Sequence, residues 1–347
     1  MAITSLSSPP PPEQLPPYRV SVVTAAEYPA GLAAAPDGRL FYSELFRGRV
    51  RVIGPDGGVD PVPWADVNAE FGIEWTQYHH GGLTGIAFDP RFDDNRLVYV
   101  VTQVPDDAGL PRRSLIVRYR ERDGRGVEPT VLLEVGAAKF DNIYSLVFGP
   151  DGMLYVPSGQ SRGRPDGADP LGDLYDKILR LEPDGDPAPD NPYGADAPYA
   201  WARGLRNAFD VAFVPGTGFL LAGDNGAEAH DEINLVMPGH DYGWPRHAGA
   251  APAEGVTPPL FDYGDWRAAP TGIAHYGARL LPGLEGRFLL CHNHPPGLFA
   301  LRLDPADPGR LLSMTQVASE CSLDVVVAAD GAVYFSDASA IYRLEAP

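Results

Sequence analysis

The sequence predicts an all-β fold, a six-bladed β-propeller closed by an N-terminal strand that joins the last blade. First, one pattern occurs six times: an alternating apolar strand, a turn of Pro, Asp or Gly, and a second strand rich in Leu, Tyr and Val. Second, the copies recur about every 50–65 residues, which is typical of propeller blades. Third, long amphipathic helix patterns are lacking, while 39 Gly and 37 Pro suit many tight turns.

The blades can be assigned in order along the chain. The inner hairpins begin at Gly31, Leu83, Tyr144, Phe209, Thr271 and Leu323. Further strands of these blades begin at Gly48, Ser114, Lys177, Glu232 and Leu298. Residues 18–25 alternate like a strand, and the chain ends with another strand from Ala340. These two terminal strands are expected to pair and close the ring.

The composition favours one large domain. Apolar residues make up 44% of the chain and charged residues 21%, which excludes a disordered protein. We expect residues 18–347 to form the propeller and residues 1–17, rich in proline, to be a disordered leader. Two long insertions, 67–80 and 161–175, are candidate lids or simple surface loops.

Charge and cysteine content limit the possible binding partners and the possible cellular compartment. The net charge of −19 and the pI of about 4.7 argue against nucleic acid and anionic membranes as partners. No apolar stretch approaches the ~20 residues of a membrane helix, and residues 1–17 lack the pattern of a secretory signal. Cys291 and Cys321 are too few for a disulfide scaffold. We therefore expect a cytoplasmic protein that acts on a small polar substrate, with its oligomeric state open.

Four longer phrases carry a resemblance to a known family. They start at Gly81, Asp176, Arg203 and Asp231. In these phrases the chain resembles the soluble glucose/sorbosone dehydrogenase family, and the resemblance extends from about Arg19 to Glu345. Members of that family are six-bladed propellers that oxidise aldoses with pyrroloquinoline quinone (PQQ) and calcium.

The resemblance implies a changed quinone site. The family's catalytic histidine is replaced by Asp141, and the lysine that pairs with the quinone carboxylates falls at His294. The family's two arginines in blade six fall at Cys321 and Leu323. Each charge-assisted contact contributes roughly 1.5–3 kcal/mol, so three losses would weaken quinone binding by about three orders of magnitude or more. We therefore do not expect this chain to use PQQ as a cofactor.

Other family positions are retained. The Arg-Asn pair that contacts the quinone is kept as Arg206 and Asn207, and the resemblance places Asp224 and Asn225 beside the same pocket. It also implies a structural calcium at two positions further along the chain, Glu232 and Tyr242. A second, catalytic calcium would sit on the backbone carbonyls of Gly226 and Ala227.

The repeats give an independent map of the pocket. His80, Asp141 and Arg206 lie seven or eight residues before the last core residue of their inner strands, which places them at a similar height around the axis. With His294 in blade five, they form a candidate catalytic group. His80, Asp141 and His294 could bind a divalent transition metal. Alternatively, Asp141 and His80 could act as acid and base while Arg206 and Asn207 hold an oxygen.

Weaker candidates surround this group. His292 and His294 alternate as on a strand, so both could face one side. Cys321 could act as a nucleophile, although an unpaired cysteine is more often a small buried thiol. Three residues of the first insertion could cap the pocket: Glu74, Trp75 and Tyr78.

The sequence leaves three functions open. The first is an enzyme on a sugar-dehydrogenase scaffold that has lost quinone chemistry and performs metal-assisted or acid/base reactions of the lyase, hydrolase, cyclase or isomerase type. The second is a PQQ- and calcium-dependent sugar oxidoreductase with a rearranged site. The third is a non-catalytic propeller that binds a ligand or a protein.

Overall fold

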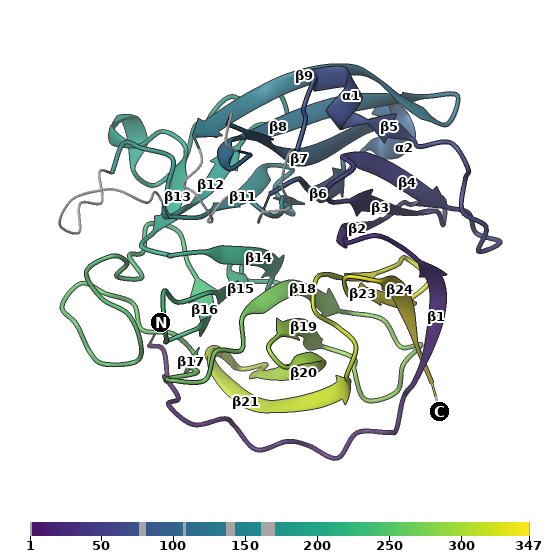
Figure 1. Ribbon diagram of the computed structural model, residues 1–347. Helices are drawn as coiled ribbons and strands as arrows, with labels where there is room; N and C mark the ends of the chain where they lie inside the picture. Colours follow the sequence, from purple (N-terminus) through teal and green to yellow (C-terminus); the bar gives the residue numbers. More distant parts are fainter. Residues whose placement is uncertain (1, 76–80, 107–108, 137–142, 161–170, 347) are drawn as a thin grey trace.

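The chain forms a ring of six four-stranded antiparallel sheets around a central axis (Figure 1). The computed structural model describes residues 2–75, 81–106, 109–136, 143–160 and 171–346. Each sheet is one blade, and the predicted six-bladed β-propeller is confirmed.

The strands follow one another from the axis outward in the first five blades. Blade one consists of β2 (Pro29–Ala34), β3 (Leu40–Glu44), β4 (Arg49–Ile53) and β5 (Ala65–Asp66). Blade two consists of β6 (Leu83–Phe88), β7 (Leu97–Pro105), β8 (Pro111–Arg122) and β9 (Arg125–Gly136). Blade three consists of β10 (Val147–Phe148), β11 (Leu154–Ser158), β12 (Lys177–Leu181) and β13 (Ala200–Arg203).

The remaining blades complete the ring. Blade four consists of β14 (Ala208–Phe213), β15 (Leu220–Asp224), β16 (Glu232–Val236) and β17 (Phe261–Asp262). Blade five consists of β18 (Pro270–Tyr276), β19 (Arg287–Asn293), β20 (Pro296–Asp304) and β21 (Asp307–Ala318). Blade six consists of β22 (Val325–Val327), β23 (Val333–Ser336), β24 (Ala340–Glu345) and β1 (Arg19–Ala25).

The ring closes through the two terminal strands, as predicted. β1 pairs antiparallel with β24, with Arg19 opposite Glu345 at one end and Ala25 opposite Ala340 at the other. The N-terminal strand thereby becomes the outer strand of the last blade. This pairing ties the two ends of the chain together within blade six, and β22 and β23 of that blade contact β2 of blade one.

Short helices interrupt the strand pattern among the described residues. They are α1 (Val67–Phe71), α2 (Phe92–Asn95) and the 3₁₀ turn η1 (Gly194–Asp196). α1 lies in the first predicted insertion, where the Asp66 carboxylate caps it by accepting the N–H of Ala69 at 3.1 Å. No helix in the described part of the chain is long and apolar enough to cross a bilayer.

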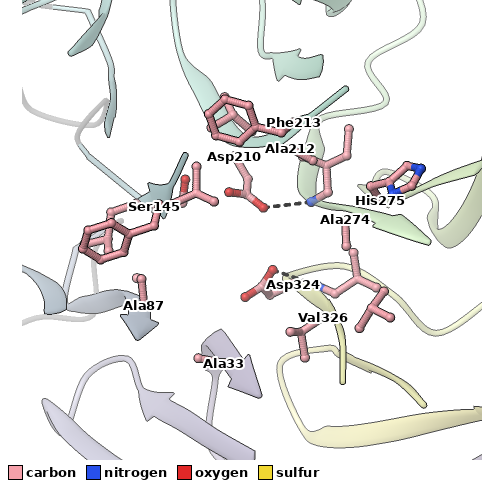
Figure 2. A pocket seen from close by; sticks show the side chains of 18 of the residues that line it. Ala33, Ala87, Ser145, Asp210, Ala212, Phe213, Ala274, His275, Asp324 and Val326 are labelled. Atoms are coloured by element: carbon pink, nitrogen blue, oxygen red, sulfur yellow. Dashed lines mark hydrogen bonds between the residues drawn. The ribbon is translucent and has the colours of Figure 1, made fainter. Parts of the chain in front are cut away.

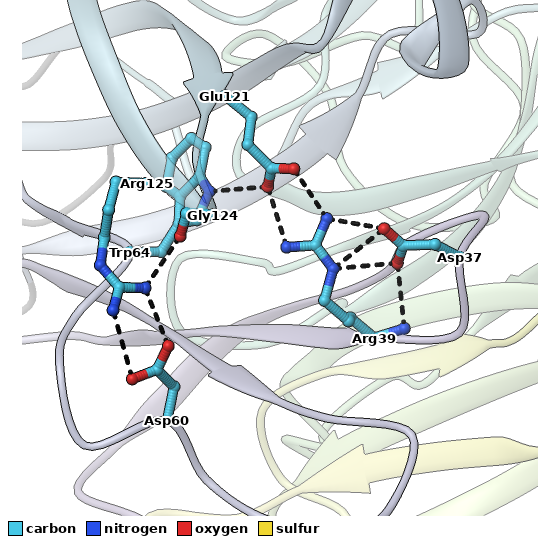
Figure 3. A network of polar contacts seen from close by, with 7 residues as sticks. All are labelled: Asp37, Arg39, Asp60, Trp64, Glu121, Gly124 and Arg125. Carbon is cyan, nitrogen blue, oxygen red and sulfur yellow. Dashed lines mark hydrogen bonds and ion pairs between the residues drawn. The ribbon is translucent and has the colours of Figure 1, made fainter.

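Neighbouring blades are joined by close backbone packing and by polar networks. A Cβ atom on Gly31 of β2 would lie 1.8 Å from the carbonyl oxygen of Thr84 in β6, so this contact requires glycine. Further out, the Glu121 carboxylate of blade two accepts hydrogen bonds from Arg39 and from the indole N–H of Trp64 in blade one (Figure 3). Both contacts fix blade one against blade two.

Residues 2–17 form an extended strap, where the sequence led us to expect disorder. The segment runs around the outer edge of blade five to reach β1 (Figure 1). The N–H groups of Thr4 and Leu6 donate to the carbonyls of Gly309 and Leu260, at 2.9 and 3.0 Å. Glu13 forms ion pairs with Arg287 and Arg302. The proline-rich composition hid these contacts, because they depend on residues nearly 300 positions away.

Candidate functional site

The candidate site lies at the end of the channel where the inner strands begin, here called the N-terminal mouth. Arg206 and Asn207 come directly before β14, and Asp224 ends the neighbouring β15, where it pairs with Ala208. The Asp224 carboxylate accepts the backbone N–H groups of Arg206 at 2.9 Å and Asn207 at 2.6 Å. Asp224 thus fixes the backbone of this pair. Burial raises the pKa of Asp224 to about 6 even though these hydrogen bonds oppose the shift.

Arg206 holds the following loop with its guanidinium group. Its Nη1 donates to the carbonyl oxygens of Asn225 at 2.7 Å and Gly226 at 2.9 Å, and the guanidinium lies 5.8 Å from the ring centroid of Trp244. The Gly226 carbonyl is one of the two that the resemblance assigned to a catalytic calcium. A guanidinium cation already neutralises part of its partial negative charge, so this carbonyl is a weaker ligand for a second cation.

Two amide oxygens at this mouth are buried without a hydrogen-bond partner among the described residues. They are Oδ1 of Asn207 and Oδ1 of Asn225. The amide nitrogen of Asn225 donates to the carbonyl of Pro270 in blade five at 3.1 Å, which fixes the orientation of the side chain. A buried acceptor without a donor costs free energy. Both oxygens are therefore suited to a ligand that donates hydrogen bonds.

An acidic residue that the sequence analysis did not single out shapes the same loop. Asp231 accepts the N–H of Gly226 at 2.8 Å with one carboxylate oxygen and the N–H of Ala269 at 2.7 Å with the other. It therefore connects the Gly226 loop of blade four to the start of blade five. The signal was its position at the head of the phrase that carried the family resemblance.

His294 is exposed and follows β19 at the blade-five side of the mouth. The preceding Asn293 donates through Nδ2 to the carbonyl of Ser322 in blade six at 3.1 Å. His292 is different: its ring is fully buried, contacts the Tyr263 hydroxyl at 2.8 Å and stacks on Phe299. Desolvation lowers the pKa of His292 to about 3. The structure thus separates the buried His292 from the exposed His294, and the expectation that both face one side is wrong.

The two cysteines form a disulfide, so the expectation of free, buried thiols is wrong. Cys291 lies in β19 of blade five, and Cys321 lies just before β22 of blade six. Cys321 is therefore neither a nucleophile nor a polar contact. Leu323, at the other family arginine position, is half-buried and uncharged. Sequence alone could not pair the cysteines, because pairing depends on the distance between neighbouring blades.

Several predicted residues cannot be placed. His80 and Asp141 lie outside the described residues, as does Tyr78, so the convergence of His80, Asp141 and Arg206 stays a prediction. Of the proposed site residues, the structure brings together Arg206, Asn207, Asp224 and Asn225. Within the described ranges, no group of three or more His, Cys, Asp or Glu side chains is placed to hold a metal ion.

The predicted calcium ligands Glu232 and Tyr242 lie in different surroundings. Glu232 begins β16 and stands opposite Asp224 on one side and Asp262 on the other. Its carboxylate accepts the N–H of Gly249 at 2.7 Å and Nδ2 of Asn234 at 3.0 Å.

Burial raises the pKa of Glu232 to about 8, and the like charges of Asp224 and Asp262 add to the shift. The Oδ1 atom of the adjacent Asn234 is buried and lacks a partner among the described residues. A cation would relieve both the repulsion and the orphaned oxygen. The Tyr242 hydroxyl donates to the carbonyl of Leu235 and accepts the N–H of Met237. Only a backbone oxygen of Tyr242 is therefore left to bind calcium.

Comparison with known proteins agrees with this architecture. Residues 26–343 match the family model described as Glucose / Sorbosone dehydrogenase. An uncharacterized protein of Synechocystis is 28% identical, with 91% of this chain and 82% of that protein covered. Quinoprotein glucose dehydrogenase B of Acinetobacter calcoaceticus is 28% identical over 74% of this chain, which spans only 58% of that protein.

Two solved structures show the same fold over nearly their whole length. A putative oxidoreductase (glucose dehydrogenase) of Thermus thermophilus is 30% identical with a TM-score of 0.80, covering 94% of this chain and 99% of that one. The PQQ-bound aldose sugar dehydrogenase of Streptomyces coelicolor is 25% identical with a TM-score of 0.78, covering 97% and 99%. The chain belongs to the glucose/sorbosone dehydrogenase family.

Proposed function

We propose that this propeller binds a small hydroxyl-rich molecule at its N-terminal mouth and acts on it without quinone, by acid/base or metal-assisted chemistry. The observation that carries the proposal is the pair of buried, unpartnered amide oxygens of Asn207 and Asn225. Hydroxyl groups of a sugar-like substrate would donate to both. A substrate held there would be met by Arg206 and the carbonyls of the Gly226 loop.

The described residues fit PQQ poorly. A tri-anionic quinone needs several cationic partners, and acceptor oxygens repel its carboxylates. The Arg206 guanidinium is shared with two carbonyls, Cys321 is consumed by a disulfide, and Leu323 carries no charge. His294 offers an imidazole where the family has a lysine. We therefore assign no step to quinone in this first proposal.

In this proposal, proton transfer is carried out by residues that the sequence analysis predicted to be catalytic. His80 and Asp141 are the candidate acid and base, or metal ligands together with His294, while Arg206 and Asn207 hold a substrate oxygen. A lyase, hydrolase, cyclase or isomerase reaction would use this set. The described residues support binding of a hydroxyl-rich molecule at the N-terminal mouth. The reaction classes are proposed from the sequence alone.

The second candidate is quinone-dependent aldose oxidation. Its support is the retained Arg206-Asn207 pair and the names of the relatives, which include a quinoprotein glucose dehydrogenase and a PQQ-bound aldose sugar dehydrogenase. PQQ, when bound, supplies the two-electron acceptor for oxidation of the sugar. In this case Arg206 and Asn207 would contact the cofactor rather than the substrate.

One set of measurements separates the two candidates. Purified full-length protein is titrated with PQQ in the presence of calcium, followed by absorbance, and dye-linked oxidation of glucose is assayed in parallel. The first proposal predicts weak quinone binding and no glucose oxidation, together with thermal stabilisation by a sugar or polyol that Asn207→Leu abolishes. Tight quinone binding with turnover would refute it and establish the second. Elemental analysis of the same protein tests for a stoichiometric transition metal.

A structural calcium at Glu232 is proposed on separate grounds. Glu232, the Asn234 amide oxygen and a backbone carbonyl at Tyr242 would supply hard oxygen ligands. Calcium should then raise the melting temperature and EDTA should lower it, with both responses lost in Glu232→Gln. Equal melting curves with calcium and EDTA would contradict this site.

Location of the protein in the cytoplasm remains a proposal. The disulfide argues against it, because disulfides persist mainly in oxidising compartments. Cell fractionation with acid-quenched thiol labelling would decide. Cys291 and Cys321 recovered as free thiols in the cytosol would support the prediction, and a fully oxidised pair outside the cytosol would contradict it.

A further inference from the structure

A large cavity lies at the other end of the channel, where the inner strands end. Its volume is 810 Å³, and residues of all six blades line it. Arg206, Asn207 and His294 are not among the lining residues. We call this cavity the C-terminal funnel (Figure 2). Cavities of about 300–1,000 Å³ are typical of small-molecule sites.

The walls of the funnel are apolar because of one repeat position. The side chains that follow each other around the axis at this position are Ala33, Ala87, Val147, Ala212, Ala274 and Val326. The rings of Phe148 and Phe213 also border the cavity. A ligand that enters from this side would therefore contact mainly hydrocarbon, with His275 as a polar neighbour, on its way to the floor.

The floor is set by the repeat position two residues earlier, which faces the same side of each inner strand. Around the ring it is occupied by Gly31, Gly85, Ser145, Asp210, Gly272 and Asp324. Glycine in three blades lets neighbouring inner strands approach closely, because a Cβ atom on Gly31, Gly85 or Gly272 would lie 1.8, 3.1 or 2.5 Å from the backbone of the next blade. These three blades therefore add no side chain to the space around the axis. The two carboxylates extend into this space from blades four and six and face each other across it (Figure 2).

Each carboxylate is held in place by the backbone of the next blade. Asp210 Oδ2 accepts the N–H of Ile273 at 2.9 Å, and Asp324 Oδ2 accepts the N–H of Leu32 at 2.7 Å. The Ser145 hydroxyl lies beside Asp210 (Figure 2). Within the described ranges, neither carboxylate forms an ion pair with a Lys, Arg or His side chain. Two carboxylates thus meet in a partly desolvated channel. Burial, to which the charge of Asp210 adds, raises the pKa of Asp324.

We infer that the C-terminal funnel is a binding site for a small primary amine with an aliphatic body, whose ammonium group lies between Asp210 and Asp324. An ammonium group donates three hydrogen bonds and supplies the positive charge that the floor lacks. The aliphatic body would pack against the alanine walls and the rings of Phe148 and Phe213. A bare metal ion would leave these apolar walls unused.

The inference does not depend on the proposed function, and its test uses neither sugar nor quinone. Full-length protein is titrated calorimetrically with n-hexylamine at pH 8, and with 1-hexanol as a neutral probe of equal length. We expect the amine to bind and the alcohol to bind at least tenfold more weakly. Asp210→Asn and Asp324→Asn should each weaken the amine at least tenfold, because each removes a negative charge. Asp210→Asn is the cleaner variant, since its amide oxygen still accepts the Ile273 N–H. Asp324→Asn loses one of two acceptors, because the Asp324 carboxylate accepts the N–H groups of both Leu32 and Val325.

Two controls locate the effect. Asp224→Asn removes a buried carboxylate at the opposite mouth and should leave amine affinity unchanged, while Ala274→Phe narrows the funnel and should reduce it. Melting temperatures of all variants exclude unfolding as the cause. Equal binding of amine and alcohol, loss of amine binding in Asp224→Asn, or no amine binding at millimolar concentration would each overturn the inference. Calcium binding that is abolished by Asp210→Asn, with no effect on the amine, would overturn it in favour of a metal site.

Discussion

Cys321, just before the inner strand of blade six, is bonded to Cys291 in the second strand of blade five. The disulfide therefore fastens two neighbouring blades to each other at the N-terminal mouth. It occupies a position where the family places an arginine toward the quinone.

The cross-link should make a measurable contribution to stability. It closes a loop with a sequence separation of 30 residues, which corresponds to about 3–4 kcal/mol by chain entropy. We expect Cys291→Ser to lower the melting temperature by about 5 °C in a chain of this length. Cys321→Ser and the double variant should show the same loss, because either change removes the same bond. A double variant much less stable than both single variants would contradict this account.

Restoring one positive charge should partly restore quinone affinity. Leu323→Arg leaves the disulfide intact and returns an arginine to a position where the family has one. We expect PQQ to bind about tenfold more tightly, the effect of one charge-assisted contact of about 1.4 kcal/mol. Leu323→Gln, of similar polarity but uncharged, is the matched control. Unchanged affinity in Leu323→Arg, measured by absorbance titration with calcium present, would show that this position does not face the quinone.

Sequence analysis predicted the fold because each blade repeats the same local signals. Alternating strands and turn residues recur at every copy, so an error in one blade is corrected by the others. The β1–β24 closure followed from the two unpaired strands at the chain ends. Arg206 was found in the same way, from its fixed offset to an inner strand, whereas Asn207 was predicted from the family resemblance.

The parts that sequence analysis missed depend on contacts without local periodicity. The strap at residues 2–17 is held by ion pairs to blade five, which a proline-rich composition does not reveal. The disulfide depends on the distance between two blades. Asp210 and Asp324 occupy the same position of the repeat in two blades. Their electrostatic interaction across the axis could not be predicted from the sequence, because it arises only when the ring is closed.

The strap should detach in acid or when its anchoring charge is removed. The hydrogen bond from Arg287 lowers the pKa of Glu13 to about 2, so this contact stabilises the folded strap above a pH of about 4.5 and is lost as the pH falls toward 2. Because Glu13 is partly exposed, we expect Glu13→Gln to cost only about 1 kcal/mol. Hydrogen exchange should show faster exchange at Thr4 and Leu6 in this variant. Arg302→Gln, which removes the more exposed partner, should have the smaller effect; the reverse order would show that Arg287 is not the main anchor.

The carboxylates of the channel should make the wild-type protein less stable as the pH rises. Burial raises the pKa of Asp210 to about 6, above its ordinary value of 3.8. Between these two values the folded state binds more protons than the unfolded chain, so the free energy of unfolding falls as the pH increases. Asp210→Asn removes this ionisation and also the repulsion with Asp324, while it keeps the acceptor for the Ile273 N–H. We therefore expect the variant to match the wild type near pH 4 and to be more stable by about 1–3 kcal/mol at pH 8. Denaturant unfolding at both pH values measures the difference, and a variant less stable than wild type at pH 8 would show that a cation or another group already compensates the charge of Asp210.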